Sequence, residues 1–232
     1  MNIQHNISLS TLTTMRLGGE AAQLVEIHSP DEARQAVLYA QQHGLAWYVL
    51  GGGSNTLAHD DGFAGLIILN KIPGFEVIEK AAASASIRVG GGESWDAVVQ
   101  RTVEMNLSGI ECLSAIPGTA GAAPVQNIGA YGQKVSTVIT QVDAYDAKND
   151  AFVQLSNADC EFSYRHSIFR GREAGRYIIT AVTMKLSALP PEPPFYKAIE
   201  NYLGEHAIAA PTVQQLRSEE HTSELQSPTS IS

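Results

Sequence analysis

The segment from Ile116 to Gly132 constrains this chain more than any other. Its sequence is Ile-Pro-Gly-Thr-Ala-Gly-Ala-Ala-Pro-Val-Gln-Asn-Ile-Gly-Ala-Tyr-Gly, with hardly a bulky side chain before Tyr131. It has neither the helical spacing of apolar residues nor the alternation of a half-buried strand. Glycine permits a positive φ and a close approach of the backbone, and proline fixes φ and removes a donor. We therefore predict a backbone surface laid against a ligand, with N–H groups free to donate.

A second glycine-rich segment lies upstream, where Val49 and Leu50 are followed by Gly51-Gly-Gly-Ser-Asn55. It lacks the Gly-Lys-Ser/Thr ending of a P-loop and the glycine spacing of a dinucleotide-binding turn. A tight turn without a ligand explains one glycine triplet equally well. Because two such segments occur, we predict a large anion held by backbone N–H groups rather than by lysines.

Composition and charge exclude several other classes. The chain has 232 residues, of which 44% are hydrophobic, and this suits one or two domains with real cores. The net charge of −9 argues against a general nucleic-acid or anionic-membrane surface. Cys112, Cys160 and the histidines lack metal-ligand spacing, so no metal site is predicted. No signal peptide or apolar run of transmembrane length is present, and a cytoplasmic protein is expected.

The order of predicted elements indicates an α+β chain. Strands are predicted at 22–27, 47–50, 65–69, 75–78, 86–89, 137–145, 151–155 and 177–186, and helices at 93–104, 196–203 and from 30 onward. Ser29 followed by Pro30 is a typical helix start, with serine as N-cap and proline at the first helical position. The strand at 47–50 ends on the glycine triplet, the kind of place where open α/β sheets bind ligands. Residues 1–10 are expected to be frayed.

Four segments resemble, in the same order, segments of the UDP-N-acetylenolpyruvoylglucosamine reductases (MurB). They are Thr13–Gly19, Gly51–Asn55, Ile116–Gly132 and Phe162–Phe169. The resemblance runs from about residue 8 to about residue 216. It implies an α+β, two-lobed FAD-binding fold of the vanillyl-alcohol oxidase or p-cresol methylhydroxylase type, with the third, substrate domain missing. The implied units are FAD-binding lobe 1 (α/β) at 8–70, FAD-binding lobe 2 (α+β) at 71–188, and the start of the truncated substrate domain at 189–216.

The resemblance also implies which residues hold FAD. They are Gly51, Gly52, Gly53, Ser54, Asn55, Thr56, Ile116, Pro117, Gly118, Gly121, Ala122, Ala123, Gln126, Asn127, Gly129, Ala130, Tyr131 and Gly132. The first loop, including the Ser54 hydroxyl, is expected to donate to the FAD pyrophosphate. Gln126 and Asn127 are expected to point at flavin or substrate, with stabilisation of a turn as the alternative.

Arg165 is the predicted catalytic residue. It lies among apolar neighbours in Phe-Ser-Tyr-Arg-His-Ser-Ile-Phe, where a guanidinium needs an anion, and a structural ion pair would satisfy it as well. The resemblance implies that Arg165 binds the enolpyruvyl carboxylate and stabilises the charge that develops beside it. Tyr164 and Tyr196 are the other implied substrate-binding residues, and ordinary packing is the alternative for Tyr196.

The implied reaction is the NADPH-dependent, FAD-mediated reduction of UDP-N-acetylglucosamine enolpyruvate to UDP-N-acetylmuramate in peptidoglycan biosynthesis. A monomer is expected, with no nucleic-acid or membrane partner. In the family, a proton-donating serine in a Gly-Ser-Phe-Phe-Lys segment and a late glutamate lie beyond the position of residue 216. This chain is therefore expected to be an impaired fragment of an active parent.

The last residues, 217–232, are predicted to be an artefactual tail. From Arg217 the sequence resembles the in-frame translation of a sequencing adapter that begins AGA-TCG-GAA-GAG-CAC-ACG. Ser218 and Glu224 lie in this tail and are not assigned the roles of the family's serine and glutamate.

Two alternatives stay open. Another FAD-linked oxidoreductase of the same fold would share the glycine loops but need not contain the segments at 126–132 and 164–169. A non-catalytic FAD- or nucleotide-binding module would need only the two loops.

Overall fold

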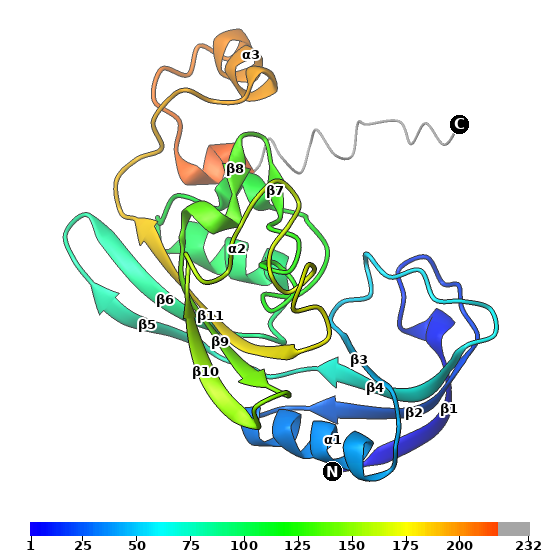
Figure 1. The fold of residues 1–232 in the computed structure, drawn as a ribbon. Coiled ribbons are helices and arrows are strands. Elements are labelled where there is room, and N and C mark those ends of the chain that lie inside the picture. The colour runs from blue at the N-terminus through cyan, green and yellow to red at the C-terminus, as the bar shows by residue number, and fades with distance from the viewer. Residues whose placement is uncertain (218–232) are drawn as a thin grey trace.

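The structure, a computed structural model, describes residues 1–217 and contains two main β-sheets (Figure 1). The four-stranded sheet has the order β1-β2-β4-β3, from β1 (Ile3–Ser8), β2 (Glu20–Ile27), β3 (Trp47–Leu50) and β4 (Phe63–Asn70). The five-stranded sheet has the order β10-β9-β11-β6-β5, from β5 (Phe75–Lys80), β6 (Ser84–Gly90), β9 (Ile139–Asp146), β10 (Ala151–Ser156) and β11 (Tyr177–Ser187). The helices are α1 (Pro30–Gln42), α2 (Trp95–Glu104) and α3 (Lys197–Glu205), and β7 (Gly129–Ala130) pairs with β8 (Gln133–Lys134).

The first sheet is built by a crossover. β2 and β3 both run parallel to β4, which lies between them, so α1 carries the chain across one strand. The helix begins as predicted, since Ser29 Oγ accepts a hydrogen bond from the backbone N–H of Glu32 at 3.2 Å and Pro30 is its first residue. The expectation that residues 1–10 are frayed is wrong. They supply β1, which pairs antiparallel with β2 and packs Ile3 and Ile7 against core residues.

The second sheet is antiparallel throughout and carries the largest core cluster. β11 lies at its centre, between β9 and β6. Trp95 and Val99 from α2 pack in one core with Ile87 of β6 and Val182 of β11. The long segment between α2 and β9 crosses this core before it reaches the sheet, so the predicted ligand loop rests on a rigid base.

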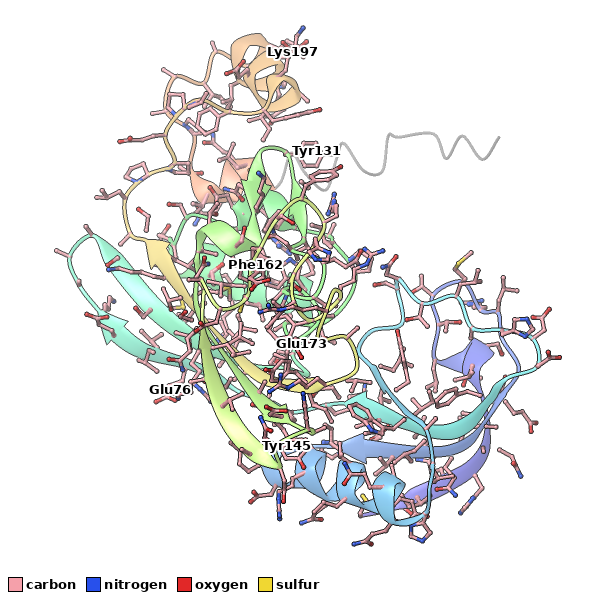
Figure 2. The ribbon with its side chains drawn as sticks, viewed as in Figure 1. Glu76, Tyr131, Tyr145, Phe162, Glu173 and Lys197 are labelled. Atoms are coloured by element: carbon pink, nitrogen blue, oxygen red, sulfur yellow. The ribbon has the colours of Figure 1, made fainter. Side chains whose placement is uncertain are left out.

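A core shared by the two sheets joins them. Val37 of α1 and Ile68 of β4 pack in one cluster with Tyr145 of β9. At the edge of this cluster, the Arg34 guanidinium donates two hydrogen bonds of 2.6 Å to the carboxylate of Asp150, which also accepts one from the Tyr145 hydroxyl at 3.0 Å. Tyr145 is labelled in Figure 2, where the β9–β10 turn comes down to α1. The two sheets are therefore held as one body.

Asp146 anchors the turn between β9 and β10. Its buried carboxylate accepts hydrogen bonds from Arg176 Nε at 2.9 Å and Nη2 at 2.6 Å, and from the backbone N–H of Lys148 at 3.0 Å. The Arg176 guanidinium, aided by that N–H, lowers the pKa of this carboxyl from the ordinary 3.8 to about 2.

We expect Asp146→Asn to make folding stability less sensitive to acid. Because the pKa is lower in the folded chain, the ionised carboxylate stabilises the fold above about pH 4, and this stability is lost as the pH falls towards 2. A shift of this size corresponds to up to about 2 kcal/mol. Urea unfolding at neutral pH and near pH 2.5 measures how much the free energy of unfolding falls on acidification, with the exposed Asp60→Asn as control. If this fall is equal for Asp146→Asn and the parent, the lowered pKa of Asp146 does not contribute to stability.

Residues 197–217 lie beside the segment that follows α2, and only Val213 among them joins the core of the second sheet. Leu203 of α3 and Leu216 of a helical turn at 213–217 contact Cys112 in a small cluster of their own. Arg217 was predicted to belong to the artefactual tail. Its guanidinium lies 3.0 Å from Asp96 Oδ1 of α2 and donates to Ser114 Oγ at 3.0 Å. The rest of that tail, 218–232, lies outside the described residues.

Over residues 1–217, none of the helices has the length and apolar character that crossing a bilayer requires.

Candidate functional site

The two glycine-rich segments meet and form one surface. A Cβ on Gly52 would lie 2.8 Å from Gly118 Cα, so this contact requires glycine. The Ser54 hydroxyl was expected to donate to a pyrophosphate, but in this structure it donates to the Pro117 carbonyl at 3.1 Å. Because these residues are glycines, the two loops can pack directly against each other. The surface that they form together faces a cavity.

This glycine cavity has a volume of about 320 Å³. Among its lining residues are Gly51, Gly52, Gly53, Ser54, Asn55, Thr56, Pro117, Gly118, Ala122, Ala123 and Gln126, all of them predicted cofactor residues. Trp95 and Arg170 also line it. Its walls come from the segment that follows β3 of the first sheet on one side and from the loops that connect strands of the second sheet on the other.

A second cavity continues from the first. This aromatic cavity, about 340 Å³, is lined by Trp47, Tyr48, Phe169 and Tyr177, and also by the predicted residue Gly121. It shares Tyr48, Val49, Gly51, Thr119, Ala122, Val125 and Arg170 with the glycine cavity. The two cavities are thus neighbouring parts of one elongated cleft, with four aromatic rings around the second part.

A third cavity, about 500 Å³, gathers the predicted substrate residues. This tyrosine cavity is lined by Asn127, Gly129, Ala130, Tyr131, Gly132, Gln133, Lys134, Tyr164, Arg165 and Tyr196. The Tyr131 and Tyr196 rings pack edge to face with centroids 5.6 Å apart. Figure 2 shows Tyr131 at the tip of the β7–β8 hairpin, facing the α3 segment. Residues from distant parts of the chain therefore converge where the resemblance places the substrate.

Arg165 lies at the tip of a tight turn. Ser163 and His166 exchange backbone hydrogen bonds of 3.0 and 3.2 Å, and Arg165 itself has a φ of +51°. The expectation that its apolar neighbours bury it is wrong, since burial begins only at Ser167 and Arg165 is exposed. Its guanidinium lies 5.9 Å from the Tyr164 ring centroid, and it forms no ion pair with any residue of the described part. The cation is therefore available to an anion that enters the cavity.

The two amides predicted to face a ligand differ in role. Asn127 is buried with a φ of +46°, and its amide donates to the Ser163 carbonyl at 2.9 Å and accepts from the Ser136 N–H at 3.1 Å. It stabilises the turn that carries Arg165, which is the alternative kept open from the sequence. Gln126 lines the glycine cavity, where its Oε1 accepts a hydrogen bond from Arg170 Nη1 at 3.1 Å.

Sequence reasoning missed two cations of these cavities. Lys134 lines the tyrosine cavity and lies two residues beyond the segment 116–132. Arg170 lines the other two cavities and directly follows the segment 162–169. Ile116, by contrast, packs against the core and lines none of the three. Among residues 1–217, every charged side chain that lines the three cavities is cationic, although the chain has a net charge of −9. This local reversal of charge favours anionic ligands.

Other reactive groups lie away from the cleft. Burial raises the pKa of the Cys160 thiol to about 12, so this cysteine is a poor nucleophile. Within residues 1–217, no group of three His, Cys, Asp or Glu side chains is placed to hold a metal ion.

Residues 21–152 match the family described as an FAD binding domain, and the chain belongs to this family. The fold agrees. The 6-hydroxy-D-nicotine oxidase of Arthrobacter nicotinovorans superimposes with a TM-score of 0.58 at 21% identity, over 82% of this chain and 42% of that one. The two sheets and the cleft between them are thus the FAD-binding fold of the vanillyl-alcohol oxidase type, as the resemblance implied.

The relatives carry a narrower name. UDP-N-acetylenolpyruvoylglucosamine reductase of Streptomyces coelicolor is 44% identical over 182 residues, which are 78% of this chain and 46% of that protein. The MurB structure from Thermus caldophilus superimposes with a TM-score of 0.71 at 23% identity, over 97% of this chain and 70% of that one. These findings confirm the family recognised from the four segments. The chain spans about half the length of the curated relative.

Proposed function

We propose that the whole protein reduces UDP-N-acetylglucosamine enolpyruvate to UDP-N-acetylmuramate for peptidoglycan synthesis in the cytoplasm, with FAD as cofactor and NADPH as hydride donor. One observation carries the proposal. An elongated cleft with a glycine-loop wall lies beside a cavity that presents Arg165, which has no ion-pair partner among residues 1–217, in a chain similar to UDP-N-acetylenolpyruvoylglucosamine reductases.

The cleft fits FAD in shape and chemistry. Gly51–Asn55 and Pro117–Gly118 bring backbone close to the glycine cavity, and the aromatic cavity offers flat rings to a planar base. When bound, the flavin supplies hydride transfer. Trp95, whose ring is fixed by a hydrogen bond from Nε1 to the Leu113 carbonyl at 2.8 Å, closes part of the glycine cavity.

In the tyrosine cavity, Arg165 would bind the carboxylate of the substrate and stabilise negative charge that develops beside it. The Asn127 amide fixes the turn that carries Arg165. The backbone of this turn therefore loses little conformational entropy when the guanidinium binds a ligand. Tyr164 and Tyr196 lie at the same cavity and would flank the substrate. The cationic lining of this cavity favours a substrate with negative charge over the uncharged ring substrate that another oxidoreductase of this fold could take.

Flavin retention tests the proposal. The purified chain is incubated with FAD, desalted and examined by absorption, and we expect a bound flavin band near roughly 450 nm, a property of the cofactor that the site only tunes. The same chain in concentrated urea is the control. A chain that melts cooperatively yet retains no flavin would contradict the cofactor site.

Turnover separates the reductase from the alternatives. In the whole protein under nitrogen, NADPH is expected to bleach the flavin band, and UDP-N-acetylglucosamine enolpyruvate is expected to restore it. A band that NADPH bleaches and this substrate leaves bleached would point to another FAD-linked oxidoreductase. A band that NADPH does not bleach would point to a non-catalytic module.

A further inference from the structure

Arg170 lies where the glycine cavity and the aromatic cavity meet. It is one of the residues that line both, together with Gly51 of the first glycine loop and Ala122 of the second. In the described part of the chain, it is the one charged side chain that lines either cavity. A ligand that fills both parts of the cleft must pass this guanidinium.

The backbone under Arg170 is firmly held. The preceding residues Ser167, Ile168 and Phe169 are buried, and Ser167 Oγ donates to the Val125 carbonyl at 2.7 Å. The Arg170 N–H donates to the Ser167 carbonyl at 3.2 Å. The backbone from which the exposed Arg170 side chain projects is therefore held by a buried anchor, and a binding residue needs such support.

The Arg170 guanidinium has no carboxylate partner among residues 1–217; the hydrogen bond from its Nη1 goes to the neutral Gln126 Oε1. Its neighbours differ. Arg172 lies 2.7 Å from Glu161 Oε1, and Arg176 is paired with Asp146 and Glu173. From Arg170 to Arg176, the loop thus contains two arginines that serve the fold and one that lines the cleft and has no carboxylate partner within residues 1–217.

We propose that Arg170 binds the pyrophosphate of FAD and so fixes the cofactor across the two cavities. The assignment rests on the proposed function. A dinucleotide carries its negative charges midway between two planar groups, so a single cation at the junction of two neutral cavities matches that charge distribution. The glycine loops supply N–H donors, and the planar guanidinium supplies full charge and paired donors, which bind phosphate oxygens well. Gln126 holds the guanidinium towards the cleft.

The same segment would then serve both ligands. Arg165 at its turn faces the tyrosine cavity, and Arg170 faces the cleft for the cofactor. The buried residues Ser167–Phe169 lie between them and fix their relative positions.

Affinities of the chain for FAD and for riboflavin, which lacks phosphate, test the assignment. Arg170→Gln is expected to raise the Kd for FAD about 10- to 100-fold, the usual effect of losing a charged hydrogen-bond pair. The Kd for riboflavin is expected to stay unchanged. Arg172→Gln makes the same charge change on the same loop outside the cavities and is expected to leave both affinities unchanged. Arg170→Lys keeps the charge without the fork and is expected to give an intermediate Kd for FAD.

The outcomes distinguish this assignment from the function on which it rests. Parent chain that binds neither flavin would overturn the cofactor site itself. Parent chain that binds FAD, with an Arg170→Gln variant that binds it equally well, would overturn the role of Arg170 alone. An equal loss for FAD and riboflavin would show that Arg170 shapes the loop instead of meeting phosphate. Far-ultraviolet circular dichroism of each variant establishes that the fold is retained.

Discussion

Replacing Trp95 by alanine is expected to lower the free energy of unfolding by about 3–5 kcal/mol. Trp95 is only 1% exposed and packs in the largest core cluster. Its indole Nε1 donates to the Leu113 carbonyl, and its backbone N–H donates to the Gly118 carbonyl at 3.1 Å. The substitution removes a large apolar volume and leaves the Leu113 carbonyl without its donor. Because Trp95 also lines the glycine cavity, FAD affinity is expected to fall with stability.

Urea unfolding followed by circular dichroism measures this effect, since the substitution removes a fluorescent probe. Trp95→Phe is the matched control. It keeps most of the apolar volume but loses the donor, so a smaller loss of about 1–3 kcal/mol is expected. A loss below about 1 kcal/mol for Trp95→Ala would show that the cavity wall does not depend on this ring.

Gly52→Ala is expected to abolish most FAD binding and to lower the free energy of unfolding by about 1–3 kcal/mol. The new Cβ would lie 2.8 Å from Gly118 Cα and 3.3 Å from its carbonyl carbon, so one loop must move away from the other. These neighbouring atoms are backbone and cannot rotate aside. The joint surface that faces the glycine cavity would open, and the FAD affinity is expected to fall by at least about tenfold.

Gly204→Ala provides the control for this prediction. Gly204 lies in α3, and a Cβ there would meet nothing within 4 Å. Alanine is the better helix former by about 1 kcal/mol, so this variant is expected to be slightly more stable and to bind FAD normally. Equal FAD affinities for Gly52→Ala and Gly204→Ala would contradict the view that contact between the loops builds the cavity.

Elements with strong local signals were predicted from the sequence. The start of α1 at Pro30 and the positions of the main strands follow from capping and periodicity, which depend on residues close together in the chain. The glycine loops were recognised for the same reason. The identity of the cofactor was not available from composition or spacing, which gave only two anion-binding loops. It came from the resemblance and is supported by the family match over residues 21–152.

Features that depend on distant contacts were not predictable in this way. β1 exists because β2 offers it an edge, and its own polar sequence gave no strand signal. Arg165 was placed among apolar neighbours, yet a left-handed residue at a tight turn brings it to the surface. Arg170 had no signal of its own, because its significance depends on a cleft that forms only where segments distant in the sequence come together.

The core that unites α1, β4, β9 and β11 limits how the cleft can respond to a ligand. Hinge closure of two lobes requires an interface that can slide or open, and a close-packed core with the Arg34–Asp150 pair at its edge resists both movements. The cofactor would therefore enter a groove whose walls are already in place. Within residues 1–217, gating must come from surface segments outside this core, such as the exposed stretch around Tyr164 or the connection from Leu189 to Tyr196. Cofactor binding and substrate access would then be mechanically independent steps. The first would depend on the rigid core, and the second on the exposed surface segments.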